Sequence, residues 1–241
     1  MKAIVTGHSK GLGAAIAAEL LGRGIPLLGL ARSRAPGLAG RFPALLLESE
    51  VDLSDSAALA GWLAGDTLVR FLAGEGAVLL INNAGVVWPV GPLAAQDPLD
   101  TVRAVTLNVA APLALAAATV RASAGARRRI LHVSSGAGRG AYPGWSVYCA
   151  TKAALDRHAE AVALDADPEV RACSLAPGVI DTGMPAEIRA TPSARFPLKE
   201  RFVQMKQEGT LAAPGDCARK LVDYLLAPDF GSSAVDDLRS A

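Results

Sequence analysis

The residue types and spacing best suited to chemistry are a tyrosine and a lysine four positions apart, Tyr148 and Lys152. On an α-helix, residues at this spacing lie on one face, about 6 Å apart along the axis. A lysine ammonium beside a phenol favours the phenolate and is expected to lower the tyrosine pKa toward neutrality. Tyr148 is therefore a candidate general acid for a carbonyl oxygen. The alternative is an ordinary pair on a surface helix.

A glycine-rich turn near the N-terminus, Thr6–Gly13, has the composition of a phosphate-binding loop. It follows an apolar run and precedes a stretch with helical periodicity. Glycines let the backbone approach a pyrophosphate, and a helix N-terminus supplies unpaired N–H groups and a partial positive charge. Three residues separate the first two glycines, which departs from the GxGxxG fingerprint and indicates a wider loop. The expected contacts come from Gly7, Ser9, Lys10, Gly11, Leu12 and Gly13.

The position expected to bind the adenosine ribose carries arginine. NAD-binding domains place Asp or Glu about 20 residues after the glycines, at the end of the second strand. Here that position falls in residues 31–34, which contain no carboxylate. A guanidinium suits phosphate, so Arg32 would pair with a 2′-phosphate, with Lys10 as a second cation. We therefore expect NADP(H) to be preferred over NAD(H), unless Arg32 and Arg34 are only solvated loop residues.

The elements that must position these residues are short apolar strands alternating with helical stretches. Strands are expected at 2–6, 25–31, 44–50, 78–82, 129–134 and 170–175, and helices at 11–23, 57–72, 97–122 and 146–165. Strands buried on both faces and separated by helices predict right-handed βαβ units. The fold class is therefore α/β: one doubly wound domain over residues 1–241, with a parallel sheet of about seven strands and helices on both faces. The polar, proline-containing segment 184–209 is expected to be a substrate lid, or else a surface excursion.

Composition excludes several function classes. Hydrophobic residues make up 51% of the 241 positions and charged residues 20%, which excludes disorder. The formal charge of +1 gives no reason to expect a nucleic-acid or membrane-surface partner. The apolar run at 105–120 is mostly alanine and is interrupted by Asn108 and Pro112, so we expect it to be too short and too weakly apolar to span a membrane. Three scattered cysteines and three separated histidines predict no disulfide framework and no metal site. No signal peptide is evident, and a cytoplasmic location is expected.

Taken in order, the motifs resemble those of the short-chain dehydrogenase/reductase family over most of the chain. They are the glycine loop, Asp52-Leu53, Asn82-Asn83-Ala84-Gly85, Asn108, Ser134-Ser135, Tyr148 with Lys152, and Pro177-Gly178 with Thr182. One such motif is weak evidence, but the ordered set is specific. The resemblance implies a Rossmann-type fold, a nicotinamide cofactor and a small-molecule carbonyl substrate.

The resemblance also implies catalytic roles. Tyr148 would give or take the substrate proton, Lys152 would lower its pKa and hold the nicotinamide ribose, and Ser135 would steady charge developing on the carbonyl. Ser135 is preferred to Ser134 because it lies thirteen residues before Tyr148, the separation that the family has. Asn108 would hold a water in a proton relay from Lys152. Alternatively, Asn108 caps a helix kink.

Further motif residues would bind the cofactor. Asp52 would hydrogen-bond the adenine edge and Leu53 would add a backbone contact, unless Asp52 is only a helix N-cap. The adenosine ribose would be lined by Asn82, Ala84 and Gly85. The nicotinamide and its carboxamide would be held by Pro177, Gly178, Ile180 and Thr182.

The second half is more similar to the sepiapterin reductase and benzil reductase branch, whose members reduce vicinal dicarbonyls with NADPH. The matching residues are Gly144-Trp145, Tyr148-Cys149, Lys152-Ala153-Ala154, Asp156, Val170-Arg171, Ala176-Pro177-Gly178, Asp181-Thr182 and Met184. Trp145 would form an aromatic wall for a flat diketone or pteridine, or it serves only in packing. Sepiapterin reductases anchor their substrate through an aspartate near the C-terminus, for which Asp236 or Asp237 is the candidate.

We therefore expect an NADPH-dependent carbonyl reductase that transfers hydride to a small ketone or vicinal dicarbonyl. Two alternatives stay open: an NADP(H)-dependent alcohol dehydrogenase acting on a sugar, steroid or acyl substrate, and a non-catalytic NADP-sensing regulatory protein. The resemblance also implies a homodimer or homotetramer, assembled through the helices expected at 97–122 and 146–165.

Overall fold

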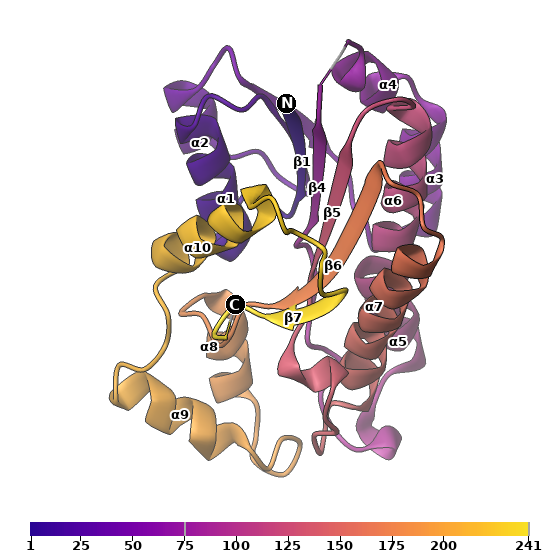
Figure 1. The fold of residues 1–241 in the computed structure, drawn as a ribbon. Coiled ribbons are helices and arrows are strands. Elements are labelled where there is room, and N and C mark those ends of the chain that lie inside the picture. Colours follow the sequence, from indigo (N-terminus) through magenta and orange to yellow (C-terminus); the bar gives the residue numbers. More distant parts are fainter. Residues whose placement is uncertain (75, 241) are drawn as a thin grey trace.

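Seven parallel strands form one sheet in the computed structural model, which describes residues 1–74 and 76–240 (Figure 1). The strands are β1 (Lys2–Thr6), β2 (Leu27–Ala31), β3 (Leu46–Glu50), β4 (Val78–Asn82), β5 (Arg128–Val133), β6 (Val170–Ala176) and β7 (Val235–Asp237). Their order is β3-β2-β1-β4-β5-β6-β7, and every neighbouring pair is parallel. The predicted doubly wound α/β sheet is confirmed. Because the strand order reverses between β1 and β4, a crevice opens at the carboxyl ends of these strands, where such sheets bind ligands.

Helices cover both faces of this sheet (Figure 1). One face carries α1 (Gly11–Gly22), α2 (Pro36–Arg41) and α10 (Pro214–Leu226). The other carries α3 (Ser56–Ala64), α4 (Thr67–Leu72), α5 (Pro98–Val105), α6 (Ala111–Ala122) and α7 (Ser146–Leu164). Two further helices, α8 (Gly183–Ala190) and α9 (Lys199–Gln207), lie beyond the carboxyl ends of the strands, at the lower left of Figure 1.

The central strands are apolar on both faces because both faces are covered. Val5 and Ile81 belong to the core under α1 and α10, whereas Ile4 and Leu80 belong to the core on the opposite side. All four side chains are fully buried. Successive residues of a strand point to opposite faces, so a continuous apolar run is what a sheet buried on both sides requires.

Several elements differ from those predicted. The helix expected at 57–72 is broken into α3 and α4 at Gly65 and Asp66, where Gly65 takes an extended conformation. The helix expected at 97–122 contains a π-helical turn, Thr106–Ala110, between α5 and α6. Helices α2 and α10 and the short strand β7 are not among the elements expected from the sequence. The two aspartates of β7 break apolar alternation, and only backbone pairing with β6 identifies it as a strand.

The helical stretch Pro98–Ala122 is, by length and composition, long and apolar enough to cross a membrane. Its mean hydropathy over the most apolar 18 residues is 1.4. The expectation that this region is too short and too weakly apolar is therefore wrong, because the π-helical turn carries the helix across Asn108. The stretch packs on the sheet with Ala104, Asn108 and Leu115 buried, and 39% of its most apolar 18 residues are buried inside the protein.

A buried polar chain crosses β4, β5 and α7. The Asn82 amide nitrogen lies 3.2 Å from His132 Nδ1, and His132 Nε2 lies 3.1 Å from His158 Nδ1. Burial lowers the pKa of His132 to about 3, and the nearby charges of His158 and Lys152 act in the same direction. His132 is therefore neutral in the folded protein at every pH where the protein is expected to work.

This buried histidine predicts a loss of stability on acidification. An unfolded histidine titrates near pH 6.5, so below that value the unfolded chain binds a proton that the folded chain refuses. The contribution of neutral His132 to the free energy of unfolding is fully present above pH 6.5. It declines by about 1.4 kcal/mol per pH unit between pH 6.5 and pH 3, so that about 2 kcal/mol is lost by pH 5. Urea unfolding at pH 7 and pH 5 measures it. His132→Gln should remove most of this difference, leaving the smaller part due to His158, whose pKa burial also lowers. If the difference in unfolding free energy between pH 7 and pH 5 is the same in His132→Gln as in the wild type, His132 is not its cause.

Candidate active site

A cavity of about 550 Å³ lies at the carboxyl ends of the strands, bounded on its far side by α8 and α9. It collects the loops that follow β1, β2, β3, β4, β5 and β6, together with one face of α7. Most predicted site residues line it: Gly7, Ser9, Lys10, Gly11, Leu12, Gly13, Arg32, Asp52, Leu53, Ala84, Gly85, Ser135, Trp145, Tyr148, Lys152, Pro177, Gly178, Ile180 and Thr182. Tertiary structure thus joins segments that are up to 175 residues apart in the chain.

The glycine loop is shaped by close backbone approach. Gly7 and Gly11 have left-handed φ values of +71° and +57°. A Cβ on Gly13 would lie 2.1 Å from the Gly7 carbonyl oxygen and 2.4 Å from the Asn83 amide nitrogen. Helix α1 begins there with Lys10 as its N-cap, and no side chain caps it. The first-turn N–H groups are therefore available to a ligand, and they fit the pyrophosphate of a dinucleotide.

The loop after β2 carries two arginines in different situations. Arg34 pairs with Glu50, with 2.8 Å between Nε and Oε1. Arg32 lines the cavity and lies close enough to Asp52 to lower the pKa of its carboxyl. Burial raises that pKa, but hydrogen bonds from the Ser54 hydroxyl and N–H, together with the Arg32 charge, hold it below its usual value. Asp52 is not the helix cap that the sequence left open, because Asp55 caps α3.

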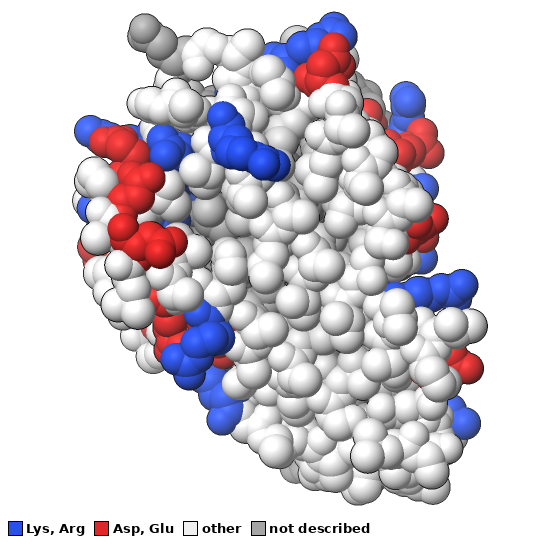
Figure 2. All heavy atoms as spheres, turned by 90° about the vertical axis from the view of Figure 1, so that its right-hand side faces the viewer, with Lys and Arg blue, Asp and Glu red and all other residues white. Residues whose placement is uncertain are grey.

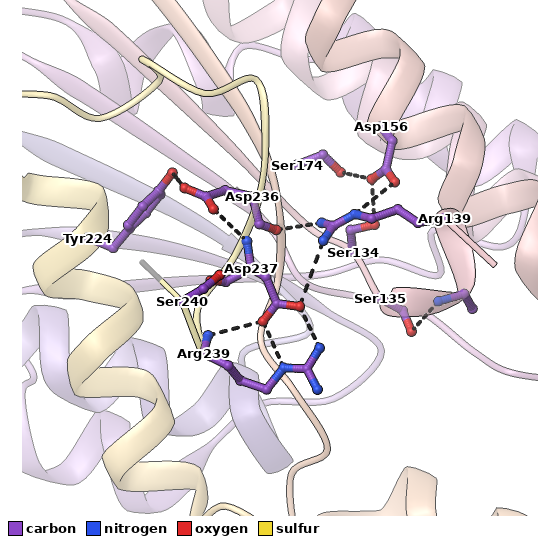
Figure 3. A network of polar contacts seen from close by, with 11 residues as sticks. Ser134, Ser135, Arg139, Asp156, Ser174, Tyr224, Asp236, Asp237, Arg239 and Ser240 are labelled. Atoms are coloured by element: carbon purple, nitrogen blue, oxygen red, sulfur yellow. Dashed lines mark hydrogen bonds and ion pairs between the residues drawn. The ribbon is translucent and has the colours of Figure 1, made fainter.

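Ser135, Tyr148 and Lys152 meet at the other end of the cavity. Lys152 Nζ lies 5.6 Å from the centre of the Tyr148 ring and donates to the Val133 carbonyl at 2.8 Å. Ser135 lies close enough to Tyr148 to lower the pKa of its hydroxyl. The adjacent Ser134 instead donates to Asp156 at 2.7 Å (Figure 3). Both serines line the cavity, and Ser134 is the one that donates to Asp156.

Burial dominates the acid–base properties of this group. It raises the pKa of Tyr148 to about 12, against the hydrogen bond from Ser135, and lowers the pKa of Lys152 to about 8, against the charge of Asp156. The expectation that Lys152 brings the Tyr148 pKa toward neutrality is therefore wrong for this structure. The ammonium faces a backbone carbonyl, and desolvation of the phenol outweighs its charge. Tyr148 is protonated at neutral pH, which is the form that a proton donor needs.

Asn108 lies behind the cavity and does not line it. Its side chain accepts from the Val86 N–H at 2.9 Å and donates to the Val86 carbonyl at 2.8 Å and the Thr151 hydroxyl at 3.1 Å. A Cβ on Gly85 would lie 3.2 Å from Asn108 Oδ1 and 3.6 Å from Lys152 Nζ, so both groups flank that glycine. The π-helical turn places Asn108 in this position, as π-bulges often do at functional sites.

The substrate end of the cavity has an aromatic wall. The Trp145 ring stacks on Phe196, 4.5 Å between centres, and meets Tyr148 and Phe202 edge-on at 5.2 and 5.7 Å. Trp145 Nε1 is buried and has no hydrogen-bond partner among the described residues. Trp145 therefore both packs and lines the cavity. The segment 184–209 contributes further wall residues: Met184, Pro185, Glu187, Ile188, Leu198, Arg201, Phe202 and Met205.

Two other predicted site residues do not reach the cavity. Asn82 is turned into the core by its bond to His132, and the neighbouring Asn83 lines the cavity and donates to the Thr6 carbonyl at 3.0 Å. Asp236 accepts from the Tyr224 hydroxyl at 2.8 Å, on the side of α10 (Figure 3). Asp237, the other aspartate considered as a substrate anchor, pairs with Arg139 and Arg239. Arg239 lines the cavity at this end, and no sequence motif marks it.

The chain belongs to the short-chain dehydrogenase family, whose sequence model matches residues 1–193, and it is therefore an oxidoreductase of that family. The sequence is 30% identical to a benzil reductase ((S)-benzoin forming) of Bacillus cereus over 96% of each chain. It is 34% identical to a sepiapterin reductase of Meriones unguiculatus, over 96% of this chain and 93% of the relative. The predicted resemblance to this branch is confirmed. A crystal structure of a short-chain dehydrogenase/reductase from Burkholderia vietnamiensis is 51% identical with a TM-score of 0.73, over 99% of this chain and 96% of the other.

The close approach at Gly13 predicts that Gly13→Ala damages both fold and site. The added methyl would overlap the Gly7 carbonyl, so we expect a loss of about 1–3 kcal/mol in stability and at least tenfold weaker NADPH binding. Gly22 ends the same helix with nothing within 4 Å of its Cβ position. Gly22→Ala should therefore leave binding unchanged and stabilise by up to about 1 kcal/mol. Thermal unfolding and NADPH titration measure both, and equal effects of the two variants would refute the packing argument.

Proposed function

We propose that the protein is an NADPH-dependent carbonyl reductase acting on small ketones or vicinal dicarbonyls. The observation that carries this is the convergence of Ser135, Tyr148 and Lys152 at a cavity end walled by Trp145 and Phe202. A flat aromatic carbonyl compound suits such a wall. The similarity to benzil and sepiapterin reductases supports the same substrate class.

In the proposed reaction, NADPH supplies hydride to the carbonyl carbon when it is bound. The protonated Tyr148 hydroxyl gives its proton to the carbonyl oxygen, so the product is the alcohol. Ser135 donates a hydrogen bond to the same oxygen and steadies the charge that develops there. Lys152, with a pKa of about 8, exchanges protons readily near neutrality and returns one to Tyr148. Asn108, beside Lys152, would hold a water that connects this lysine to solvent.

The first test is the rate of NADPH oxidation over a panel of carbonyl compounds, with NADH in parallel. The panel contains benzil, 1-phenyl-1,2-propanedione, a pteridine diketone, a keto-steroid and a β-ketoacyl thioester. We expect the aromatic diketones to be reduced fastest, and faster with NADPH. Preferred turnover of the steroid or thioester would overturn the proposed substrate class.

Tyr148→Phe should abolish turnover while leaving NADPH binding nearly intact, because only the proton donor is removed. We expect kcat to fall by at least 1000-fold and the Kd for NADPH to change less than threefold. Single-turnover kinetics and fluorescence titration measure the two quantities. Turnover at the wild-type rate would rule out Tyr148 as the acid.

The proposed preference for NADPH rests on Arg32, which lines the cavity, whereas Arg34 is paired with Glu50. Arg32→Ala should reduce the ratio of kcat/KM for NADPH to that for NADH by about 10- to 100-fold, as expected for the loss of a charge-assisted phosphate contact. Arg34→Ala is the matched control and should change the ratio less than threefold. A ratio that responds equally to both substitutions would show that the effect is general electrostatics.

We also propose a homodimer or homotetramer. Figure 2 shows the side of the molecule that carries α5 to α7, where a broad area has few charged residues. Three large apolar side chains of these helices are strongly exposed: Leu99 and Val102 on α5, and Leu164 at the end of α7. Val102→Glu should therefore lower the mass measured by light scattering. Val69→Glu, at a similarly exposed site on α4, should not, and an unchanged mass for Val102→Glu would argue against this face.

A further inference from the structure

Arg239 presents a fixed guanidinium at the substrate end of the cavity. It lies two residues after β7 and lines the cavity. Asp237 holds it in a two-pronged pair: Nε donates to Oδ1 at 2.8 Å and Nη2 donates to Oδ2 at 2.6 Å (Figure 3). The Arg239 side chain is 67% exposed, and its Nη1 takes part in neither of these bonds. A planar donor held at two points keeps its outer edge in a defined orientation.

The surroundings of Arg239 place its side chain on the wall of the cavity that also holds the reacting groups. Its side chain packs on Gly178, where a Cβ would lie 3.5 Å from Arg239 Cδ. Tyr142 also lines this cavity, close enough to raise the Arg239 pKa. The Tyr142 hydroxyl in turn lies 3.7 Å from the Cβ position of Gly136, the residue after Ser135. Arg239 and Tyr142 therefore line the same cavity as Ser135 and Tyr148.

A chain of alternating charges supports this arginine from behind (Figure 3). Asp156 is buried and accepts from Ser134 and from Ser174. Arg139 lies 3.8 Å from Asp156 and 3.7 Å from Asp237, and Asp237 then holds Arg239. In this series of ion pairs, Asp156 and Asp237 each lie next to an arginine. Of these charged groups only the cation Arg239 lines the cavity, and Asp156 and Asp237 do not.

The charges on the cavity wall favour an anion. Among the described residues that line the substrate end, Lys152, Arg201 and Arg239 are positive and Glu187 is negative. The aspartates that would bind an amino group of a substrate are turned away: Asp236 toward Tyr224, and Asp237 toward its two arginines. Because the exposed Arg239 lines the cavity where an aspartate was expected, the complementary ligand group is an anion and not a cation.

We propose that Arg239 is a specificity residue that selects carbonyl substrates carrying a carboxylate next to the ketone, such as aryl 2-oxo acids. The aryl group would lie against Trp145 and Phe202, the ketone would face Ser135 and Tyr148, and the carboxylate would accept from Arg239. This assignment rests on the proposed carbonyl reductase function and narrows its substrate class. Cationic or amino-rich substrates such as pteridines are disfavoured by the same residue.

The test compares benzoylformate with its uncharged methyl ester, using NADPH. Arg239→Gln should lower kcat/KM for the acid by about 10- to 100-fold and change that for the ester less than threefold. Arg239→Lys, which keeps the charge and loses the planar fork, should fall between wild type and Arg239→Gln for the acid. At saturating NADPH, raising the salt concentration should slow the acid reaction of the wild type and leave the ester reaction unaffected, because the contact of the carboxylate with Arg239 is exposed. The acid-to-ester ratio is kcat/KM for benzoylformate divided by kcat/KM for its methyl ester. If this ratio is the same in Arg239→Gln as in the wild type, the proposal is overturned.

Two controls separate recognition from structural disturbance. Arg157→Gln removes an exposed arginine on α7 that pairs with Glu160, outside the cavity, and should leave the ratio unchanged. Arg239→Gln combined with Asp237→Asn removes the carboxylate that the single variant leaves uncovered. If the double variant recovers the wild-type ratio, repulsion by Asp237 explains the loss, and the proposal fails. A loss confined to the KM for NADPH would assign Arg239 to the cofactor and would also overturn it.

The failure of this inference can be told apart from failure of the proposed function. If benzil and the methyl ester are reduced but the acid-to-ester ratio does not depend on Arg239, only the inference about Arg239 is rejected. If no carbonyl compound is reduced, the proposed function fails, and binding decides the inference. Calorimetric titration of benzoylformate into NADPH-saturated protein should then show at least tenfold tighter binding to wild type than to Arg239→Gln. Equal affinities would overturn it.

Discussion

The site depends on the burial of one polar face of α7 against the ends of β5 and β6. Tyr148, Lys152 and Asp156 follow one another at four-residue intervals on this helix, and each is less than 10% exposed. Removing an ammonium from water is costly, so Lys152 must find partners inside the protein. It finds the Val133 carbonyl at the end of β5 and the charge of Asp156 one turn further on. This requirement fixes how α7 lies on the sheet, and it places the Tyr148 hydroxyl beside Ser135.

The remaining elements arrange space around this fixed face. The change of strand order at β1 and β4 opens the crevice, and the approach of Gly13 to the Gly7 carbonyl lets α1 begin at its floor. The π-helical turn brings Asn108 against the backbone of Val86, which holds the loop after β4 in place. Each of these contacts is local. Each is needed because the cavity is formed by the ends of strands and by loops, which have few packing contacts of their own.

The C-terminal segment supplies what the family motifs do not. Residues after α10 run along the end of β6, and the pairing of Asp237 with Arg139 and Arg239 ties them to the buried Asp156 (Figure 3). The helices α8 and α9 complete the wall, with Ile188 from α8 and Arg201 and Phe202 from α9. Ser135, Tyr148, Lys152 and Trp145 therefore come from the regular α/β core, whereas the rest of the cavity wall near them comes largely from two segments packed onto it. This division lets one scaffold serve many substrates.

The sequence by itself determined the parallel α/β fold, the glycine loop and the group of Ser135, Tyr148 and Lys152, because each is encoded by residues close together in the chain or by apolar runs of fixed period. Only the tertiary structure decided which residues near those motifs face the cavity. Asn82 and Asn83 are adjacent, yet only Asn83 lines it, because the bond to His132 turns Asn82 inward. Asp236 and Arg239 are three residues apart, yet only the arginine reaches the site, because Tyr224 and Arg139 hold the Asp236 carboxylate and carbonyl away from it. The pKa of Tyr148 was likewise decided by burial, which depends on every element packed around the phenol and is not encoded in the spacing of Tyr148 and Lys152.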